Sequence, residues 1–375
     1  MFREQRAAGE GAADVDLERV DPALRAATRR TRLPDVSRPW IRLLLRAAGR
    51  IIPVPRVTGV EVSSIRVAGQ RARLSRPRSR SGSPSRSESR PRSETRSENA
   101  ALLWVHGGGL LIGDARQDEG LCAETARELG IVVVSVNYRL APEHPFPAAH
   151  DDIHAGWRWV QRNAAQLGVD RTRIVVGGES AGGGLAAGVV QRIRDEGGVQ
   201  PVGQWLFAPM IDDRTATDRA LDAIDHPVWN NRFNRAGWGA YLGDRAGGDA
   251  VPLYAAAARA ENVAGLPPAY LAVGDIELFF AEVRDYARRW AARLRELGPR
   301  HRACTSADRP RAPLAPRRHL DGLLTVRRRV DRHPIAASRV DDLRRVRQRV
   351  HRRRRWGRRR RGRVGGCRRS SRRGW

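Results

Sequence analysis

The sequence predicts an α/β fold built on a mostly parallel sheet, and three observations lead to this prediction. From residue 101 onward, short apolar runs alternate with longer stretches of helical periodicity, the pattern of a parallel sheet covered by helices. The chain has 375 residues, enough for one large α/β domain. Its hydrophobic content of 41% excludes a wholly disordered chain, and no apolar run reaches the ~18 residues of a membrane-spanning helix.

The first expected element is helical and covers residues 21–55. Apolar residues such as Trp40, Leu43 and Leu44 recur there at three- and four-residue spacing, with arginines between them. A basic amphipathic helix of this kind can lie on a membrane surface. Packing of the apolar stripe against the same protein is the commoner use, and we expect that arrangement here.

The next segment alternates in polarity and is followed by a strongly biased one. Residues 60–74 alternate like one or two strands. Residues 75–97 consist almost wholly of Ser, Arg, Pro and Glu, and cannot bury enough apolar area to offset the entropy lost on ordering. We therefore expect a flexible linker or surface loop, with a phosphorylated Ser-Arg tract as the alternative.

The strands and helices of the predicted sheet follow from residue 101. Apolar runs predict strands at 101–105, 131–136, 173–176, 204–208 and 270–273. Helical periodicity marks 117–129, 148–167, 181–196 and 282–297. Residues 212–268 break this alternation and are long for a connection, so we expect a small insertion near the functional site.

The sharpest motif is GGESAGGG at residues 177–184, directly after the apolar run 174–176 and directly before a helical pattern. It contains Gly-x-Ser-x-Gly centred on Ser180, and so tight a turn between strand and helix needs small neighbours around an exposed nucleophile. A glycine-rich turn can instead cradle a phosphate. The P-loop lysine and the spacing of a dinucleotide-binding loop are both missing from this segment.

A second glycine motif precedes Ser180 by some seventy residues. The apolar run 102–105 leads into HGGG at residues 106–109. Glycines let the backbone approach a ligand closely, and N–H groups aimed at a developing oxyanion contribute roughly 2.7–4 kcal/mol per donor. A plain tight turn is the alternative for this motif alone.

Together with NYRLAPEHPFPA at residues 137–148, these motifs make the segment 101–298 resemble the hormone-sensitive-lipase-like branch of the α/β-hydrolase superfamily, a group of carboxylesterases. The resemblance implies an α/β-hydrolase fold with an N-terminal helical cap over the acyl pocket. It also implies that Gly108, Gly109 and Ala181 donate N–H groups to the oxyanion, and that His106 orients the loop.

This resemblance divides the chain into four parts. They are cap helices and a first strand at 1–68, a disordered Ser/Arg-rich loop at 69–99, a catalytic domain at 100–298 and an Arg-rich tail at 299–375.

The resemblance places the acid of the catalytic triad at Glu277, in LAVGDIELF at residues 271–279. Glu at this position is chemically workable, because either carboxylate can orient an imidazole and stabilise its charged form. Asp275 is a rival two residues earlier, and a plain surface carboxylate is the alternative for both.

The catalytic histidine is unknown. In the family it lies roughly thirty residues after the acid in a His-Gly-Phe context, but position 307 is Ala307 here. His301, His319, His333 and His351 all lack that context. Without a base, a serine is a weak nucleophile at neutral pH, so both an active and an inactive or poorly folded chain are compatible with the sequence.

The composition changes abruptly after Gly298. Residues 299–375 hold 28 arginines and 5 acidic residues, a net charge of +23, whereas residues 101–298 carry −5 and residues 1–100 carry +11. All 70 basic residues of the chain are arginine. Out-of-frame translation of GC-rich DNA yields Arg, Pro, Ala and Gly in such excess, so we hypothesise a frameshift near Gly298 and a disordered or out-of-frame tail.

The competing hypothesis is a noncatalytic protein on a hydrolase scaffold, whose Arg-rich tail binds nucleic acid or other polyanions with strong salt dependence. The tail sequence has no zinc-ligand spacing and no regular aromatic interleaving. No specific nucleic-acid partner is therefore expected.

The expected function is hydrolysis of a carboxylic ester through a serine nucleophile and an acyl-enzyme, with a small-molecule ester as substrate and no cofactor or metal. Family members often form dimers, which makes a homodimer a candidate state. No secretory signal is found, and three cysteines are too few for a disulfide framework. We therefore expect a cytoplasmic protein without membrane association.

Three further groups of residues are weaker candidates for a functional site. His150 and His154 stand at i and i+4 of a helix, as in zinc proteases, but the general-base Glu is missing, so surface histidines are the better interpretation. His226 and Trp229 are candidates to line the substrate pocket, with core packing as the alternative. Cys122 is expected to be buried rather than reactive.

Overall fold

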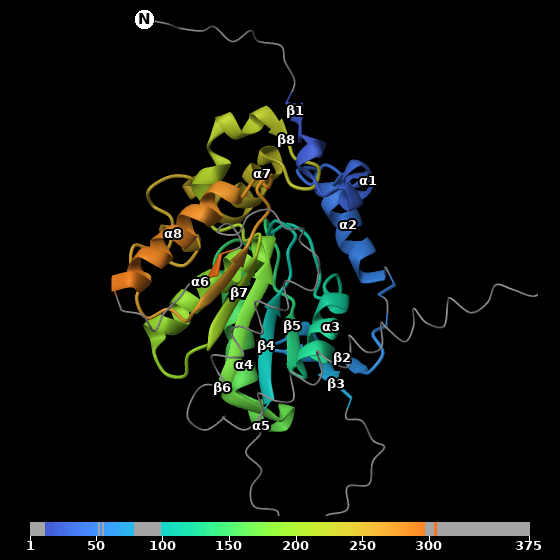
Figure 1. Ribbon diagram of the computed structural model, residues 1–375, viewed down its shortest axis with the longest axis vertical. Helices are drawn as coiled ribbons and strands as arrows, with labels where there is room; N and C mark the ends of the chain where they lie inside the picture. Colours follow the sequence, from blue (N-terminus) through green and yellow to red (C-terminus); the bar gives the residue numbers. More distant parts are fainter. Residues whose placement is uncertain (1–11, 52, 55, 79–98, 297–303, 306–375) are drawn as a thin grey trace, which may run out of the picture. The chain divides into compact units, whose positions relative to one another are not determined.

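The computed structural model describes residues 12–51, 53–54, 56–78, 99–296 and 304–305 (Figure 1). The chain divides into two units, residues 1–326 and 327–375, and the second lies wholly outside the described residues. All elements reported below belong to the first unit.

An eight-stranded sheet lies at the centre of this unit (Figure 1). Its order is β10-β9-β7-β6-β4-β5-β3-β2. The strands are β2 (Val60–Val67), β3 (Gln70–Pro77), β4 (Asn99–Val105), β5 (Val132–Val136), β6 (Val169–Glu179), β7 (Gly203–Phe207), β9 (Ala269–Ala272) and β10 (Cys304–Thr305). Strand β3 pairs antiparallel with β2 and with β5, and every other pairing is parallel. The predicted fold class, a mostly parallel sheet with helices, is confirmed.

Helices connect these strands. They are α1 (Pro22–Arg30), α2 (Pro39–Ile51), α3 (Glu119–Leu129), α4 (Ala148–Arg162), α5 (Ala164–Leu167), α6 (Ser180–Glu196), α7 (Asn231–Leu242) and α8 (Phe280–Glu296). Short 3-10 turns are η1 (Leu17–Arg19), η2 (Asp213–Ala216), η3 (Arg219–Ala223), η4 (Gly243–Arg245) and η5 (Ala257–Arg259). The helices predicted at 117–129, 148–167, 181–196 and 282–297 are confirmed, the second as α4 followed by α5.

The sheet separates two hydrophobic cores, and strand β4 shows why. Leu103 and Val105 point into the larger core, which α4, α6 and α8 cover, whereas Leu102 and Trp104 point into the smaller core under α3. Successive side chains of a strand alternate between faces, so a strand that is buried on both faces is apolar throughout. This explains the unbroken apolar run at 101–105.

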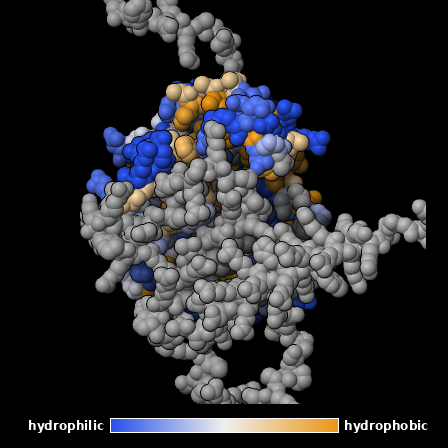
Figure 2. Space-filling view, viewed as in Figure 1, coloured by the Kyte–Doolittle hydropathy of each residue, from blue (hydrophilic) through white to orange (hydrophobic). Residues whose placement is uncertain are grey.

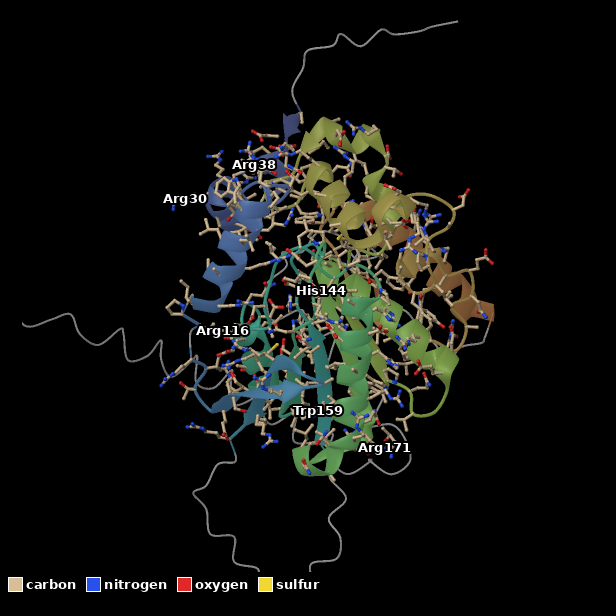
Figure 3. The ribbon with its side chains drawn as sticks, turned by 180° about the vertical axis from the view of Figure 1, so that it is seen from behind. Arg30, Arg38, Arg116, His144, Trp159 and Arg171 are labelled. Atoms are coloured by element: carbon tan, nitrogen blue, oxygen red, sulfur yellow. The ribbon has the colours of Figure 1, made fainter. Side chains whose placement is uncertain are left out.

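The segment predicted as one helix at 21–55 forms two, α1 and α2, and the packing expected for it is wrong. The apolar residues Trp40, Leu43 and Leu44 face solvent, while Ile41 is buried and Leu45 packs against the core. Arg116 Nη1 also donates a hydrogen bond to the carbonyl of Arg50 near the end of α2 (Figure 3). Periodicity placed the apolar residues on one face, but tertiary contacts decide which face turns inward.

Two strands lie in parts of the chain that were expected to be disordered. Residues 70–77 form β3, because Ala72 and Leu74 are buried and the backbone is paired on both sides; this strand extends the predicted strand region 60–74 into the predicted 69–99 loop. Cys304 and Thr305, within the predicted 299–375 tail, pair with β9 as β10. Ladder hydrogen bonds outweigh the local composition at both places. All of 79–98, and all of 299–375 except 304–305, lie outside the described residues.

The insertion predicted at 212–268 is confirmed as a group of turns around α7, and it meets the N-terminal segment. Strand β1 (Ala13–Asp14) pairs with β8 (Ile224–Asp225), and Arg32 bridges Asp14 and Asp225. Figure 2 shows hydrophobic side chains between hydrophilic ones at the end of the molecule that carries β1 and β8. The cap is therefore built from two segments far apart in sequence.

A buried acidic residue fixes helix α8 against the loop after β7. Glu282 accepts hydrogen bonds from the N–H of Ile211 at 2.8 Å and from the hydroxyl of Thr215. Burial raises the pKa of Glu282 to about 8. Because α8 begins just after Glu277, this contact holds the loop of the predicted triad acid in place.

Candidate active site

Ser180 lies at a strained turn between β6 and α6. Its φ angle of +51° is one that L-residues with a side chain rarely adopt. The glycines on either side leave no room for a side chain. A Cβ on Gly182 would lie 2.2 Å from the carbonyl oxygen of Val105, and a Cβ on Gly178 would lie 2.5 Å from the carbonyl oxygen of Gly182. The turn therefore presents the half-exposed Ser180 beyond the carboxyl end of the sheet.

The loop after β4 lies against this turn. A Cβ on Gly107 would lie 3.3 Å from the Cβ of Ser180. Gly108 and Gly109 have φ angles of +118° and +59°. Within the described residues, neither of their N–H groups has a hydrogen-bond acceptor. The N–H of Ala181 belongs to the first turn of α6, where a helix offers no acceptor of its own. Three N–H groups near Ser180 are thus available to a ligand oxygen.

His106 is held inside the same loop. Its Nδ1–H donates to the carbonyl of Gly107 at 2.8 Å, and its ring stacks on Tyr138 at 4.3 Å. The Tyr138 hydroxyl donates in turn to the carbonyl of His106. Burial lowers the pKa of His106 to about 4, so the ring is neutral at pH 7. These contacts agree with a residue that orients the loop.

The structure separates the two rival acids. Asp275 is exposed and pairs with Arg19 at 3.2 Å. Glu277 is half-buried, its N–H donates to the carbonyl of Gly274, and burial raises the pKa of its carboxyl group. A plain surface carboxylate therefore describes Asp275 but not Glu277.

In the part of the chain that the structure describes, no histidine hydrogen-bonds to Ser180 or Glu277. His150 stacks on Tyr254, and His154 pairs with Glu196. Both histidines are buried, so their expected surface position is wrong, because this face of α4 packs against α6. The unassigned candidates His301, His319, His333 and His351 lie outside the described residues.

His226 lies close to the loop that carries Glu277, a position that the sequence did not predict. Burial lowers the pKa of His226, and the neighbouring backbone of Ile276, next to Glu277, partly opposes this shift. His226 also lines a pocket of about 430 Å³ between the N-terminal segment and the insertion, together with Leu33 and Phe233. Trp229 instead lies across the glycine loop, where a Cβ on Gly109 would meet its ring. No local sequence signal could have joined residues 226 and 276.

The buried Asp118 and the half-buried Glu179 are neighbouring carboxyl groups close to the nucleophile turn. Asp118 accepts a hydrogen bond from Trp104 Nε1 at 2.8 Å, and Gln117 Nε2 donates to Glu179 Oε1 at 3.5 Å. Burial and the neighbouring Asp118 raise the pKa of Glu179 to about 8, and burial raises that of Asp118 to about 6. Both carboxyl groups therefore bind a proton more strongly in the folded chain than in the unfolded chain.

Glu179→Gln is expected to weaken the pH dependence of stability. Because the folded pKa of Glu179 is above its ordinary 4.5, the folded state binds more protons between pH 4.5 and about 8, and the free energy of unfolding falls as pH rises through that window. The amide cannot ionise. Urea unfolding measures the free energy of unfolding at about pH 5 and at about pH 9. Between these two values, it should fall by on the order of 1–3 kcal/mol less in Glu179→Gln than in the wild type. Glu124→Gln, at an exposed glutamate, is the matched control; a wild-type pH dependence in Glu179→Gln would contradict this expectation.

No helix among residues 12–296 with their stated gaps is long and apolar enough to cross a membrane. The same described residues contain no group of three His, Cys, Asp or Glu side chains arranged to hold a metal ion.

Comparison with known proteins identifies the family. Residues 102–298 match the model of a family with the α/β-hydrolase fold, and the match ends where the Arg-rich sequence begins. The chain is 42% identical over 181 residues to esterase LipI of Mycobacterium tuberculosis, covering 47% of this chain and 55% of LipI. It is 38% identical over 204 residues to carboxylic ester hydrolase LipN of the same organism, covering 52% of each. The chain thus spans about half the length of these curated relatives.

Comparison with a solved structure supports the same family. A bacterial heroin esterase is 32% identical, with a TM-score of 0.67, and the comparison covers 84% of this chain and 98% of that one. These comparisons agree with the sheet order, the turn at Ser180 and the glycine loop at 107–109. The chain belongs to the hormone-sensitive-lipase-like branch of the α/β-hydrolase fold family.

Proposed function

We propose that the protein hydrolyses small-molecule esters of carboxylic acids through an acyl-enzyme on Ser180. The observation that supports this most directly is the strained Ser180 beside two glycine N–H groups that lack an acceptor among the described residues. Relatives named as an esterase and a carboxylic ester hydrolase point to the same reaction.

The proposed reaction has two halves. Ser180 Oγ attacks the ester carbonyl carbon, and the resulting oxyanion accepts hydrogen bonds from the N–H groups of Gly108, Gly109 and Ala181. The C–O bond to the alcohol then breaks and leaves an acyl-Ser180, which water hydrolyses to release the acid. No cofactor takes part.

Proton transfer needs a base, for which we propose a histidine oriented by Glu277. The half-buried position of Glu277 supports its assignment over Asp275, which Arg19 already engages. The base itself would come from residues outside the described ranges. His106 is unsuited to the role, since its ring is packed inside the loop and its Nδ1–H is committed to Gly107.

A fluorophosphonate tests the proposal, because Ser180 Oγ would displace fluoride at phosphorus and remain covalently phosphonylated. Mass spectrometry of the digested full chain is expected to find the label on the peptide that contains Ser180, and labelled protein should lose p-nitrophenyl acetate hydrolysis. Heat-unfolded chain is the control for nonspecific labelling. An unlabelled Ser180, with ester hydrolysis equal to buffer, would exclude the proposed function for this chain.

A further inference from the structure

Helix α2 carries an apolar stripe that faces away from the protein. Trp40, Leu43, Leu44 and Ile51 have exposed fractions of 60%, 62%, 61% and 78%. Ala47, between them, is also exposed. Residues three or four positions apart share one face of a helix, so these side chains form a continuous outer surface, here called the outer face of α2.

The outer face is not what holds α2 to the protein. The opposite side does this, through the buried Ile41 and through Arg46. Arg46 donates hydrogen bonds to the carbonyls of Leu111 and Ala141, both at 2.8 Å, and pairs with Glu143 at 3.0 Å. Five apolar side chains on the outer face therefore remain free to contact something else.

Positive charge surrounds this surface. Helices α1 and α2 contain six arginines and no acidic residue. Arg29, Arg30 and Arg50 are exposed and form no ion pair with any described residue. Figure 3 shows Arg30 on the outer side of the cap, together with Arg38, which pairs with Asp35 at 3.4 Å. The exposed apolar stripe thus lies near three exposed arginines that have no acidic partner among the described residues.

We propose that the outer face of α2 docks onto a lipid bilayer with anionic headgroups. Indole and aliphatic side chains that enter the headgroup region, flanked by arginines that attract anionic lipid, are the features of an interfacial helix. A second copy of the chain fits less well, because a two-fold interface places the same patch on both partners and would bring arginines against arginines. This inference replaces two expectations from the sequence, that the stripe packs against the protein and that the protein does not associate with a membrane.

Docking would place the bilayer close to the glycine loop. Arg46 of α2 binds the carbonyl of Leu111, and the N–H of Leu111 donates to the carbonyl of Gly108 at 3.1 Å. Apolar esters partition into bilayers, so a docked cap would bring the site to its substrate. This consequence rests on the proposed function, whereas docking itself does not.

Vesicle flotation with the full chain tests the proposal. Phosphatidylcholine vesicles with about 30 mol% phosphatidylserine in about 0.1 M salt are expected to carry the wild type upward, and pure phosphatidylcholine vesicles much less of it. The triple variant Trp40→Ala/Leu43→Ser/Leu44→Ser keeps every arginine and should bind the anionic vesicles about tenfold more weakly or less. Its thermal midpoint should equal that of the wild type, because all three side chains are exposed.

The controls separate α2 from the arginines of residues 299–375, which attract the same vesicles. Leu253→Ser, at a leucine that is 67% exposed elsewhere, should bind like the wild type. Equal binding by the triple variant and the wild type would overturn the proposal, since charge alone would then account for binding. Failure of the wild type to float would overturn it too. A dimer that forms in solution and is lost in the triple variant, without vesicle binding, would assign the outer face to a second copy.

Discussion

Ser180→Ala is expected to lower kcat/KM for a p-nitrophenyl ester by about 10³-fold or more. The substitution removes the attacking oxygen and leaves the glycine N–H groups in place. Any residual rate would come from oxyanion binding alone, which accelerates the reaction far less than a complete nucleophilic site. Initial rates on the full chain, with buffer hydrolysis subtracted, measure the effect.

The fold should not change in this variant, because Ser180 Oγ makes no hydrogen bond to any described residue. Ser63→Ala on β2, at the far edge of the sheet, is the matched control and should keep the wild-type rate. An equal rate in Ser180→Ala and the wild type would show that the observed hydrolysis does not use this serine. Loss of labelling by fluorophosphonate in Ser180→Ala would confirm that both assays report the same residue.

The nucleophile turn and the glycine loop could be predicted because their constraints are local. Gly178 and Gly108 are needed by steric contacts four residues further along the chain, because a Cβ on Gly178 would meet the carbonyl of Gly182 and one on Gly108 that of Ile112. The apolar run of β4 is local in the same way, since every residue of a strand buried on both faces must be apolar. Such features indicate both the sheet and the position of Ser180 from the order of residues alone.

The remaining features depend on contacts between distant parts of the chain. Asp118 and Glu179 meet only because β4 and β6 are neighbours, with α3 lying over the smaller core. The apolar stripe of α2 was visible in the sequence, but the contacts of Arg46 with Leu111 and Ala141 decide that it turns outward. The catalytic base is a different case: the segment that should hold it departs from the family after Gly298, so no pattern identifies it.

Gly182→Ala is expected to damage both stability and activity. The new Cβ would lie 2.2 Å from the carbonyl oxygen of Val105 and 2.3 Å from that of His106. Both contacts are backbone atoms of β4 and the loop after it, so no side chain can rotate away. Overpacking of this kind costs about 3 kcal/mol, to be read from urea unfolding. The shift of α6 away from the glycine loop should also lower kcat by about 100-fold, because a displacement near 1 Å separates the attacking atom from its oxyanion donors.

Gly239→Ala tests whether the damage comes from contact rather than from the substitution itself. Gly239 lies in α7, is exposed, and a Cβ there would meet nothing within 4 Å. Alanine is favoured over glycine inside a helix by about 1 kcal/mol, so Gly239→Ala should unfold at slightly higher urea and keep the wild-type kcat. If Gly182→Ala behaved like Gly239→Ala, the close approach of α6 to β4 would be absent in solution. The glycine N–H groups would then be too far from Ser180 to stabilise an oxyanion formed on its substrate.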